Sequence, residues 1–253
     1  MSGLSLKNNF YLCYPILEKD LPSVYHKIKT TIDRRVPFYE LRIDYLLEQG
    51  VAIDSIIDCI NDLVKTFSNK KFIVTIRTKN EGGAIDIPFD EYYVYVKELV
   101  EKSKAHYIDI EYKYYILDLA AFNTLIEKFK VKTILSKHIF SDKFSKEKCE
   151  EIINCLIKTK CSIAKLAMTV CEKKDLFYFM NTAKRYSRKL KESNKNAIFI
   201  AMGEMGRLSR IYPEYTNTRI VFINAYNNGS ILGQYSLNNY IEYRKLLAKL
   251  GKN

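Results

Sequence analysis

The stretch Ser162-Ile163-Ala164-Lys165-Leu166-Ala167-Met168-Thr169 is a short apolar run with a single lysine in its middle. Apolar runs of this length without alternating polar positions are typical of strands that are buried on both faces, as in parallel sheets. A lysine on such a strand must reach water, pair with an anion or lose its charge, because an isolated buried ammonium is costly. A neutral amine can attack a carbonyl carbon and form a Schiff base. The alternative is an edge strand whose Lys165 points to solvent, and this stretch alone leaves both readings open.

The same kind of run recurs along the chain, and amphipathic segments rich in Lys and Glu lie between the runs. The predicted strands are Tyr11–Ile16, Phe38–Ile43, Phe72–Ile76, Tyr107–Ile110, Lys132–Ser136, Ile163–Met168, Ala197–Ala201 and Arg219–Ile223. The predicted helices are Ile53–Phe67, Phe89–Lys102, Ile116–Phe129, Lys146–Lys158, Lys173–Lys191 and Asn238–Leu250. Eight strands that alternate with helices over 253 residues predict a (β/α)8 barrel, with residues 1–253 as a single catalytic domain. An open doubly wound sheet is the alternative fold, but no GxGxxG turn supports a dinucleotide site.

The composition limits the partners and the compartment. The net charge is +12, which suits an anionic partner such as nucleic acid, a membrane surface or a small acidic metabolite. The basic residues are spread along the chain, and no basic-aromatic strip appears, so we expect a solvated basic surface and no nucleic-acid partner. The six cysteines show no CxxC pair, which predicts free thiols in a reducing compartment. We expect a cytoplasmic protein without a membrane segment, because no signal peptide and no bilayer-length apolar stretch is present.

Polar residues collect at the carboxyl ends of the predicted strands, where barrels of this kind keep their active sites. In chain order these are Glu40, Arg42 and Asp44, then Arg77 and Glu81, Asp109 and Glu111, Ser136 and His138, Lys165, Arg210, and finally Ser230 and Gln234. The two-residue period of a strand puts Glu40, Arg42 and Asp44 on one face. A buried layer of salt bridges is the alternative explanation for the charged residues, and a satisfied core histidine is the alternative for His138. The convergence of a histidine, a strand-borne lysine and several arginines at one mouth favours a binding site for a polar ligand.

Seven segments in register resemble one known family. They are Glu40-Leu41-Arg42-Ile43-Asp44, Thr75-Ile76-Arg77 with Glu81-Gly82-Gly83, Asp109-Ile110-Glu111, Ser136-Lys137-His138, Ala164-Lys165-Leu166-Ala167, Met202-Gly203 with Gly206 and Ser209-Arg210, and Ser230 with Gly233-Gln234. In this order and approximate spacing the chain resembles the type I 3-dehydroquinate dehydratases of the shikimate pathway. It departs from the family's pattern at Met168-Thr169-Val170, at Phe222-Ile223-Asn224 and at Ile231-Leu232.

The resemblance implies a barrel without metal or cofactor that dehydrates 3-dehydroquinate to 3-dehydroshikimate through an imine, as a homodimer. It implies that Lys165 attacks the C3 ketone, that His138 is the general acid and base, and that Glu81 orients His138. It also implies that Arg210 holds the substrate carboxylate and that Ser230 and Gln234 belong to a loop that closes over the substrate. By the same resemblance, Glu40, Arg42 and Arg77 bind the ring hydroxyls.

The chemistry agrees with these roles. A cationic iminium supplies the electron sink that removal of a weakly acidic C2 proton requires. Lys165 must be neutral to attack, and a desolvated position beside arginines is expected to lower its pKa. Another imine-forming barrel enzyme, such as an aldolase, would share Lys165, although Arg210, Gln234 and Glu81-Gly82-Gly83 favour the dehydratase. A basic nucleic-acid-binding protein and a non-catalytic barrel are the remaining alternatives.

Overall fold

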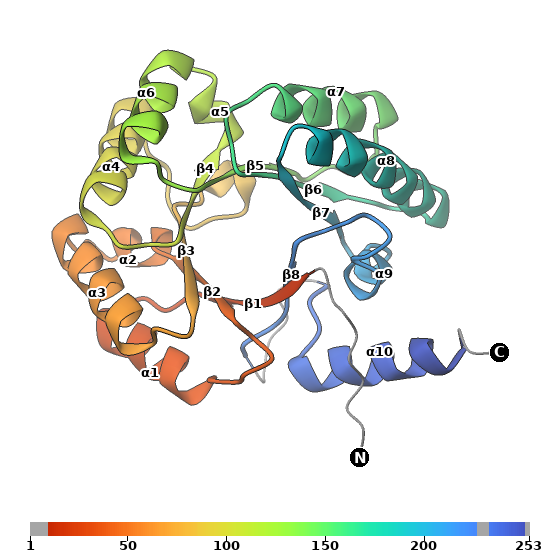
Figure 1. Cartoon of the computed structure of the whole chain (residues 1–253), viewed down its shortest axis with the longest axis horizontal. Coiled ribbons are helices and arrows are strands. Elements are labelled where there is room, and N and C mark those ends of the chain that lie inside the picture. Colours follow the sequence, from red (N-terminus) through yellow and green to blue (C-terminus); the bar gives the residue numbers. More distant parts are fainter. Residues whose placement is uncertain (1–9, 227–232, 251–253) are drawn as a thin grey trace.

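The computed structural model describes residues 10–226 and 233–250, and its eight parallel strands form a barrel that helices surround (Figure 1). The strands are β1 Tyr11–Ile16, β2 Phe38–Arg42, β3 Lys71–Thr75, β4 Tyr107–Glu111, β5 Thr133–Ile139, β6 Ile163–Thr169, β7 Asn196–Met202 and β8 Ile220–Phe222. Consecutive strands pair from β1 to β7, and β8 pairs with β1. The ring closes through a bridge between Ala197 on β7 and Thr218, just before β8. The predicted (β/α)8 barrel is therefore confirmed.

The helices follow the strands in alternation. They are α1 Leu21–Thr30, α2 Asp44–Glu48, α3 Ile53–Thr66, α4 Phe89–Lys102, α5 Tyr112–Tyr115, α6 Leu119–Phe129, α7 Lys146–Ile157, α8 Lys173–Glu192, α9 Arg207–Ile211 and α10 Leu237–Leu250, with a 3-10 turn, η1, at Lys79–Glu81. None of the described helices combines the length and the apolar character that crossing a membrane requires. The six cysteines, all within the described residues, are free thiols as predicted.

Both faces of the strands are buried, which explains their continuous apolar runs. Outward-facing residues such as Ile108 and Ile110 join the core between the barrel and its helices. Inward-facing residues such as Ile134, Ile163 and Ile198 form a second apolar cluster inside the barrel. Closer to the carboxyl ends of the strands, polar residues such as Glu40, Arg77 and Lys165 share the interior with apolar members of this cluster. Ala167, Ile200 and Phe222 of the cluster line the same cavity as these polar side chains.

Local capping sets several helix starts. Asp20 accepts a hydrogen bond from the Ser23 backbone N–H at 2.8 Å and begins α1, a helix that the sequence analysis did not predict. Asp118 caps α6 in the same way through the Ala121 N–H at 2.9 Å, so the predicted start at Ile116 is wrong by three residues. Residues 112–115 form the separate short helix α5.

Two strand ends also differ from the prediction. Strand β2 ends at Arg42, and α2 begins at Asp44. The sequence analysis treated Asp44 as a strand residue on the face of Glu40 and Arg42, whereas the structure places it in the helix. Strand β5 continues to Ile139, three residues beyond the predicted end at Ser136. Consequently His138 is held by ladder pairing with β6, opposite Ala167, and does not lie in a loop.

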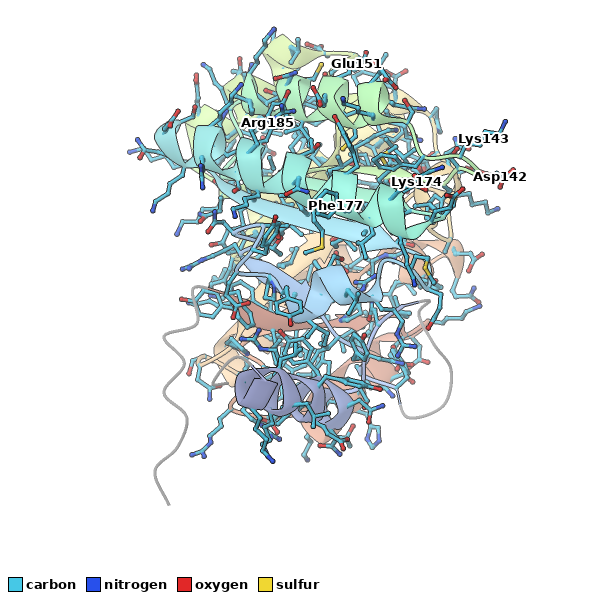
Figure 2. The ribbon with its side chains drawn as sticks, turned by 90° about the vertical axis from the view of Figure 1, so that its right-hand side faces the viewer. Asp142, Lys143, Glu151, Lys174, Phe177 and Arg185 are labelled. Carbon is cyan, nitrogen blue, oxygen red and sulfur yellow. The ribbon has the colours of Figure 1, made fainter. Side chains whose placement is uncertain are left out.

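The course of helix α8 distinguishes the end of the barrel that carries the carboxyl ends of the strands from the end that carries their amino ends. Helix α8 runs from Lys174, near the end of the barrel where Asp142 and Lys143 follow β5, past Phe177 and Arg185 towards the other end (Figure 2). Phe177 is exposed on its outer surface. The end beside Asp142 and Lys143 carries the carboxyl ends of the strands.

Candidate active site

A cavity of about 410 Å³ opens at the carboxyl ends of the strands. Eight of the nine predicted site residues line it, namely Glu40, Arg42, Arg77, Glu81, His138, Lys165, Arg210 and Gln234. The ninth, Ser230, and the segment Ile231-Leu232 lie outside the described residues. Residues that are up to 194 positions apart in the sequence, Glu40 and Gln234, thus share one cavity.

Lys165 points into the barrel and is 3% exposed, so the alternative of a solvent-facing lysine on an edge strand is wrong. Its Nζ lies 3.3 Å from Glu40 Oε1 and 3.1 Å from Asp109 Oδ2. The amine also lies 4.6 Å from the centre of the Phe222 ring. The nearest charged partners of Lys165 are therefore carboxylates, whereas the sequence analysis expected arginines. A buried lysine in such a pair is compensated in its charged form.

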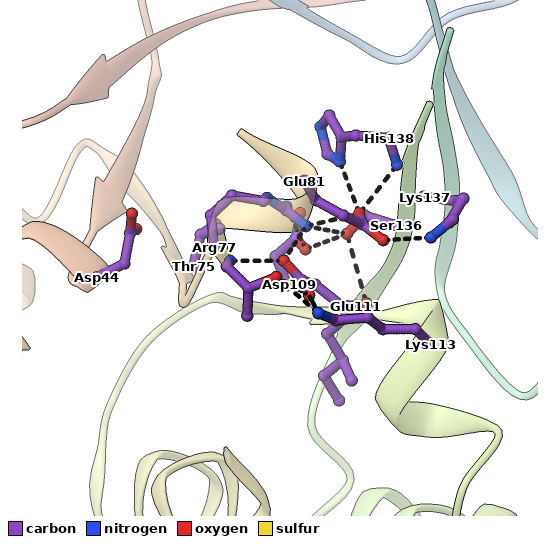
Figure 3. Close-up of polar contacts among 12 residues, drawn as sticks. Asp44, Thr75, Arg77, Glu81, Asp109, Glu111, Lys113, Ser136, Lys137 and His138 are labelled. Carbon is purple, nitrogen blue, oxygen red and sulfur yellow. Dashed lines mark hydrogen bonds and ion pairs between the residues drawn. The ribbon is translucent and has the colours of Figure 1, made fainter. Parts of the chain in front are cut away.

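Arg77 is the central cation of a buried network (Figure 3). Its Nη2 donates to Asp109 Oδ1 at 2.8 Å, and its Nη1 donates to Ser136 Oγ at 2.9 Å. Nη1 also lies 3.3 Å from Glu111 Oε1 and 3.5 Å from Glu81 Oε2. Burial raises the pKa of Asp109, but the charges of Arg77 and Lys165 outweigh burial and hold that pKa well below its usual range. Asp109 is thus a permanent anion between two cations.

Glu111 fixes the segment that follows β3. Its two oxygens accept hydrogen bonds from the Thr78 backbone N–H at 2.8 Å and from Thr78 Oγ1 at 2.9 Å. Lys113 Nζ donates to Thr78 Oγ1 at 2.8 Å and completes the arrangement. Because Thr78 precedes η1, these bonds determine where Glu81 enters the cavity.

Glu81 holds His138 by two contacts. The His138 backbone N–H donates to Glu81 Oε2 at 2.9 Å, and His138 Nδ1 lies 3.2 Å from the same oxygen. A carboxylate only accepts, so Nδ1 carries the proton and Nε2 is left as the acceptor of a neutral ring. Lys137 Nζ binds the other carboxylate oxygen, Oε1, at 2.7 Å, a contact that the sequence analysis did not anticipate (Figure 3).

Burial keeps His138 neutral. It lowers the pKa of His138 well below 6.5, and the charges of Arg77, Lys165 and Arg42 lower it further while Asp109 opposes them. At neutral pH the ring is therefore a base with a fixed tautomer. This is the protonation state in which an imidazole accepts a proton from a substrate carbon.

Two adjacent glycines allow Glu81 to sit where it does. Gly82 has a φ of 81°, a left-handed conformation that glycine adopts without strain. A Cβ on Gly83 would lie 1.8 Å from the Arg77 carbonyl oxygen, which leaves no room for any side chain. The turn after Glu81 is therefore packed directly against the backbone of Arg77.

Arg42 is held at the cavity wall by Asp44. Its Nε and Nη2 each donate to one Asp44 oxygen at 2.8 Å, and the Ala84 backbone N–H donates to Asp44 Oδ2 at 3.0 Å. The buried Asp44 thereby orients Arg42 bidentately. Asp44 is therefore a positioning residue for Arg42. The sequence analysis placed the two on one face but assigned no such role to Asp44.

Arg210 and Gln234 differ from these groups in their side-chain contacts within the part of the chain that the structure describes. Among the described residues, no hydrogen bond or ion pair is formed by the Arg210 guanidinium, which is 7% exposed, and Gln234 Oε1 is buried without a partner. Burial lowers the pKa of Arg210 to about 10, with Arg207 adding to the shift and Tyr235 opposing it. A buried guanidinium of this kind is a ready partner for an anion that enters the cavity.

Helix α9 fixes the position of Arg210. The Ser209 hydroxyl donates to the Gly206 carbonyl oxygen at 2.8 Å and accepts from the Ala201 N–H on β7 at 3.2 Å. A Cβ on Gly206 would lie 2.3 Å from the Ala201 carbonyl oxygen, so this helix start requires glycine. In residues 10–226 and 233–250, no group of three or more His, Cys, Asp or Glu side chains is arranged to hold a metal ion.

The geometry agrees with comparisons to known proteins. The type I 3-dehydroquinase family matches residues 12–250. The chain belongs to the type I 3-dehydroquinase family. The 3-dehydroquinate dehydratase of Streptococcus suis is 31% identical over 235 residues, which cover 92% of this chain and 97% of that relative. The same enzyme of Streptococcus sanguinis is 30% identical over 210 residues, 82% of this chain and 86% of that relative.

Solved structures share the fold of this family member. The type I 3-dehydroquinate dehydratase of Clostridium difficile superposes with a TM-score of 0.84 at 22% identity, covering 94% of this chain and 92% of that one. The 3-dehydroquinate dehydratase of Geobacillus kaustophilus gives a TM-score of 0.84 at 20% identity, covering 94% and 91%. These likenesses support the barrel.

Proposed function

We propose that Lys165 forms an imine with the C3 ketone of 3-dehydroquinate, and that the chain uses this imine to dehydrate its substrate to 3-dehydroshikimate. The chain is an enzyme of the type I 3-dehydroquinase family, and this dehydration is its reaction. The observation that carries the residue assignment is the position of Lys165, a buried amine in the wall of the same cavity as a neutral His138 and an Arg210 that has no ion-pair partner among the described residues. These three groups match a ketone, an acidic C–H bond and a carboxylate.

The reaction passes through an iminium and an enamine. Lys165 gives its proton to His138 Nε2, and its neutral Nζ adds to C3 to form a carbinolamine. His138 returns that proton to the carbinolamine hydroxyl, which leaves as water and gives a cationic iminium with His138 neutral again. His138 Nε2 removes the C2 proton, and the electron pair of that bond forms an enamine. The C1 hydroxyl then leaves as water, taking its proton from His138 and regenerating the iminium. Water hydrolyses this iminium to the product ketone and the free amine.

The surrounding charges suit these steps. Asp109 and Glu40 lie beside Lys165 Nζ, where a positive iminium develops and is stabilised by their charge. Arg210 holds the substrate carboxylate, and Gln234 supplies an amide group beside it. Glu40, Arg42 and Arg77 bind ring hydroxyls, with Arg42 and Arg77 pre-oriented by Asp44 and Asp109. Ser230 is assigned to the closing loop by the family resemblance alone.

The proposal extends to the rest of the chain. Residues 1–253 form one catalytic barrel domain, supported by the family match over 12–250. The chain works as a homodimer in the cytoplasm, needs no metal or cofactor, and has no nucleic-acid or membrane partner. Gel filtration with light scattering tests the dimer, and turnover after exhaustive chelation tests the independence from metal.

Borohydride reduction in the presence of 3-dehydroquinate tests the imine directly. Reduction should fix the substrate to the enzyme, and peptide mass spectrometry should find the adduct on Lys165. An adduct on another lysine would contradict the assignment of Lys165, and product formation without any adduct would contradict the imine. An aldolase would also give an adduct, so the products are analysed in parallel, and cleavage of a carbon–carbon bond without dehydration would favour that alternative.

We expect the acid limb of the pH profile of kcat/KM to lie below pH 6.5. His138 must be neutral to remove the C2 proton, and its pKa lies well below 6.5 because of burial. As pH falls through that pKa the ring takes up a proton and the rate falls, whereas between that pKa and neutral pH the rate stays level. Steady-state kinetics from pH 4.5 to 8 measure this limb. A limb above pH 7 would show that His138 is not the group whose protonation stops the reaction.

We also expect Lys137→Met to move this limb towards higher pH. Lys137 and Arg77 both contact Glu81, and removing one cation leaves more negative charge to stabilise an imidazolium at His138. The groups that face this pair are Glu40, Arg42, Arg77, Asp109, Lys165 and Arg210, and they are unchanged in the variant. On the plateau the rate should stay within about fivefold, because a partly exposed ion pair contributes only about 1 kcal/mol. Lys137→Arg, which keeps the charge, should restore the original profile, and an unmoved limb in Lys137→Met would refute this role.

A further inference from the structure

A second cavity, of about 690 Å³, lies at the opposite end of the barrel from the candidate active site. Its lining includes the first residue of every strand except β5 and the residue immediately before β5. These eight residues, which we call the amino-end mouth, are Tyr11, Phe38, Lys71, Tyr107, Lys132, Ile163, Asn196 and Ile220. The mouth lies at the end of the barrel that is opposite Asp142 and Lys143. Helix α8 approaches this end as it runs from Lys174 past Arg185 (Figure 2). No step of the proposed reaction uses it.

The charge around this cavity has one sign. Its lining contains Lys71, Lys130, Lys132 and Arg219 but no Asp or Glu. Within the described chain, Lys71, Lys130 and Lys132 form no salt bridge, whereas other lysines such as Lys102 and Lys160 do. Lys130 follows the last turn of α6, where a cation is favoured by the helix carbonyls. Lys71, Lys132 and Arg219 lie at strand starts, so a helix end does not explain their positions.

Aromatic rings form the floor between these cations. The ring centres of Tyr11 and Phe38 are 5.3 Å apart, and those of Phe38 and Tyr107 are 6.0 Å apart. Lys132 Nζ lies 6.0 Å from the centre of the Tyr107 ring, and the Arg219 guanidinium lies 4.6 Å from that of Tyr11. These rings are tilted to one another by 38° and 46°, so a planar ring can pack against them face or edge first while an acidic group reaches the cations beside it.

His106 adds a neutral hydrogen-bond donor. The Phe72 backbone N–H donates to His106 Nδ1 at 3.2 Å, so the ring proton resides on Nε2, which has no partner among the described residues. Burial lowers the pKa of His106, and the charges of Lys71 and Lys132 lower it further, which favours the neutral ring. Lys71, Lys132 and His106 line the same cavity.

From this juxtaposition we propose that the amino-end mouth binds a small anion that carries a planar ring, either an aromatic carboxylate or an aromatic phosphate monoester. The ring packs against the tilted rings of Tyr11, Phe38 and Tyr107, and the anionic group pairs with Lys71 and Lys132. The site is independent of the cavity at the carboxyl ends of the strands and can be occupied together with it. The proposal does not depend on the reaction assigned to Lys165.

Isothermal titration with phenyl phosphate tests this site, because the probe combines a ring with a dianion. Lys71→Gln/Lys132→Gln, which changes two exposed side chains, should weaken binding at least about tenfold, because both cations that pair with the phosphate are lost. The matched control is Lys97→Gln/Lys143→Gln, two exposed lysines away from the mouth, which should bind like the wild type. Turnover of the first double variant should equal that of the wild type, because neither lysine touches the active-site cavity.

The active site offers a competing explanation, since Arg210 also attracts anions. Arg210→Leu should therefore still bind phenyl phosphate at the amino-end mouth, whereas Lys71→Gln/Lys132→Gln should not. The substrate should not displace phenyl phosphate from the mouth. Inorganic phosphate and phenol, which carry only one of the two features, should each bind at least about tenfold more weakly. Binding that Lys71→Gln/Lys132→Gln leaves unchanged, binding that only Arg210→Leu removes, or equal binding of inorganic phosphate would each overturn the proposal.

Discussion

Lys165→Ala should lower kcat by more than about 10⁴-fold, because no other group in the cavity can form the covalent imine that makes the C2 proton acidic. The variant should remain folded. Asp109 keeps its hydrogen bonds from Arg77 and Ser136, and Glu40 keeps that from Thr75, so neither carboxylate is left without a partner. Single-turnover assays and circular dichroism measure the two effects, and borohydride should no longer trap the substrate.

Lys70→Met is the matched control for this variant. Lys70 is also a buried lysine, but its Nζ donates to the carbonyl oxygens of Asp33 and Val36 at 2.7 and 3.0 Å and does not line the active-site cavity. Its loss should lower the free energy of unfolding while kcat stays within about twofold of wild type. Turnover of Lys165→Ala at the wild-type rate would end the imine mechanism. An equal loss of kcat in Lys70→Met would show that the effect reports folding.

Arg77→Met should lower the free energy of unfolding by about 3–5 kcal/mol, because it leaves buried carboxylates without their common cation. Asp109, Glu111 and Glu81 would then face one another, and only Lys165, Lys113 and Lys137 would remain to compensate them. Urea unfolding at pH 7 measures the loss. Arg35→Met is the control, since its ion pair with Asp33 is exposed and should contribute less than about 1 kcal/mol.

The loss in Arg77→Met should shrink as pH falls. In the wild type the pKa of Asp109 is held low by Arg77, and removing Arg77 raises that pKa in the folded state. The folded variant then takes up a proton that the folded wild type does not, which stabilises the variant relative to the wild type at acid pH. A destabilisation below about 1 kcal/mol at pH 7, or one that grows as the pH is lowered, would contradict the view that Arg77 is the central cation of the network.

The sequence pattern by itself predicted the barrel fold and the group of residues that share its active-site end. The apolar run that contains Lys165 and the seven other apolar runs predicted the barrel, because both faces of a parallel strand are buried in such a fold. The places of Glu40, Arg77 and His138 towards the ends of their strands, and of Lys165 on the next strand after His138, predicted their convergence, since parallel strands end at the same side of the sheet. That convergence is what the structure shows.

Which charged side chains of the site contact one another was decided by the tertiary structure alone. Asp109 could be placed on the inner face of its strand, but not between Arg77 and Lys165, because these contacts join residues 32 and 56 positions away. The contact of Lys137 with Glu81 also depends on how the turn after β3 packs beside β5. For the same reason, the sequence placed Lys165 beside arginines but did not show that its direct partners are Glu40 and Asp109. Sequence spacing shows which residues share an end of the barrel, and only the three-dimensional packing determines which charges touch.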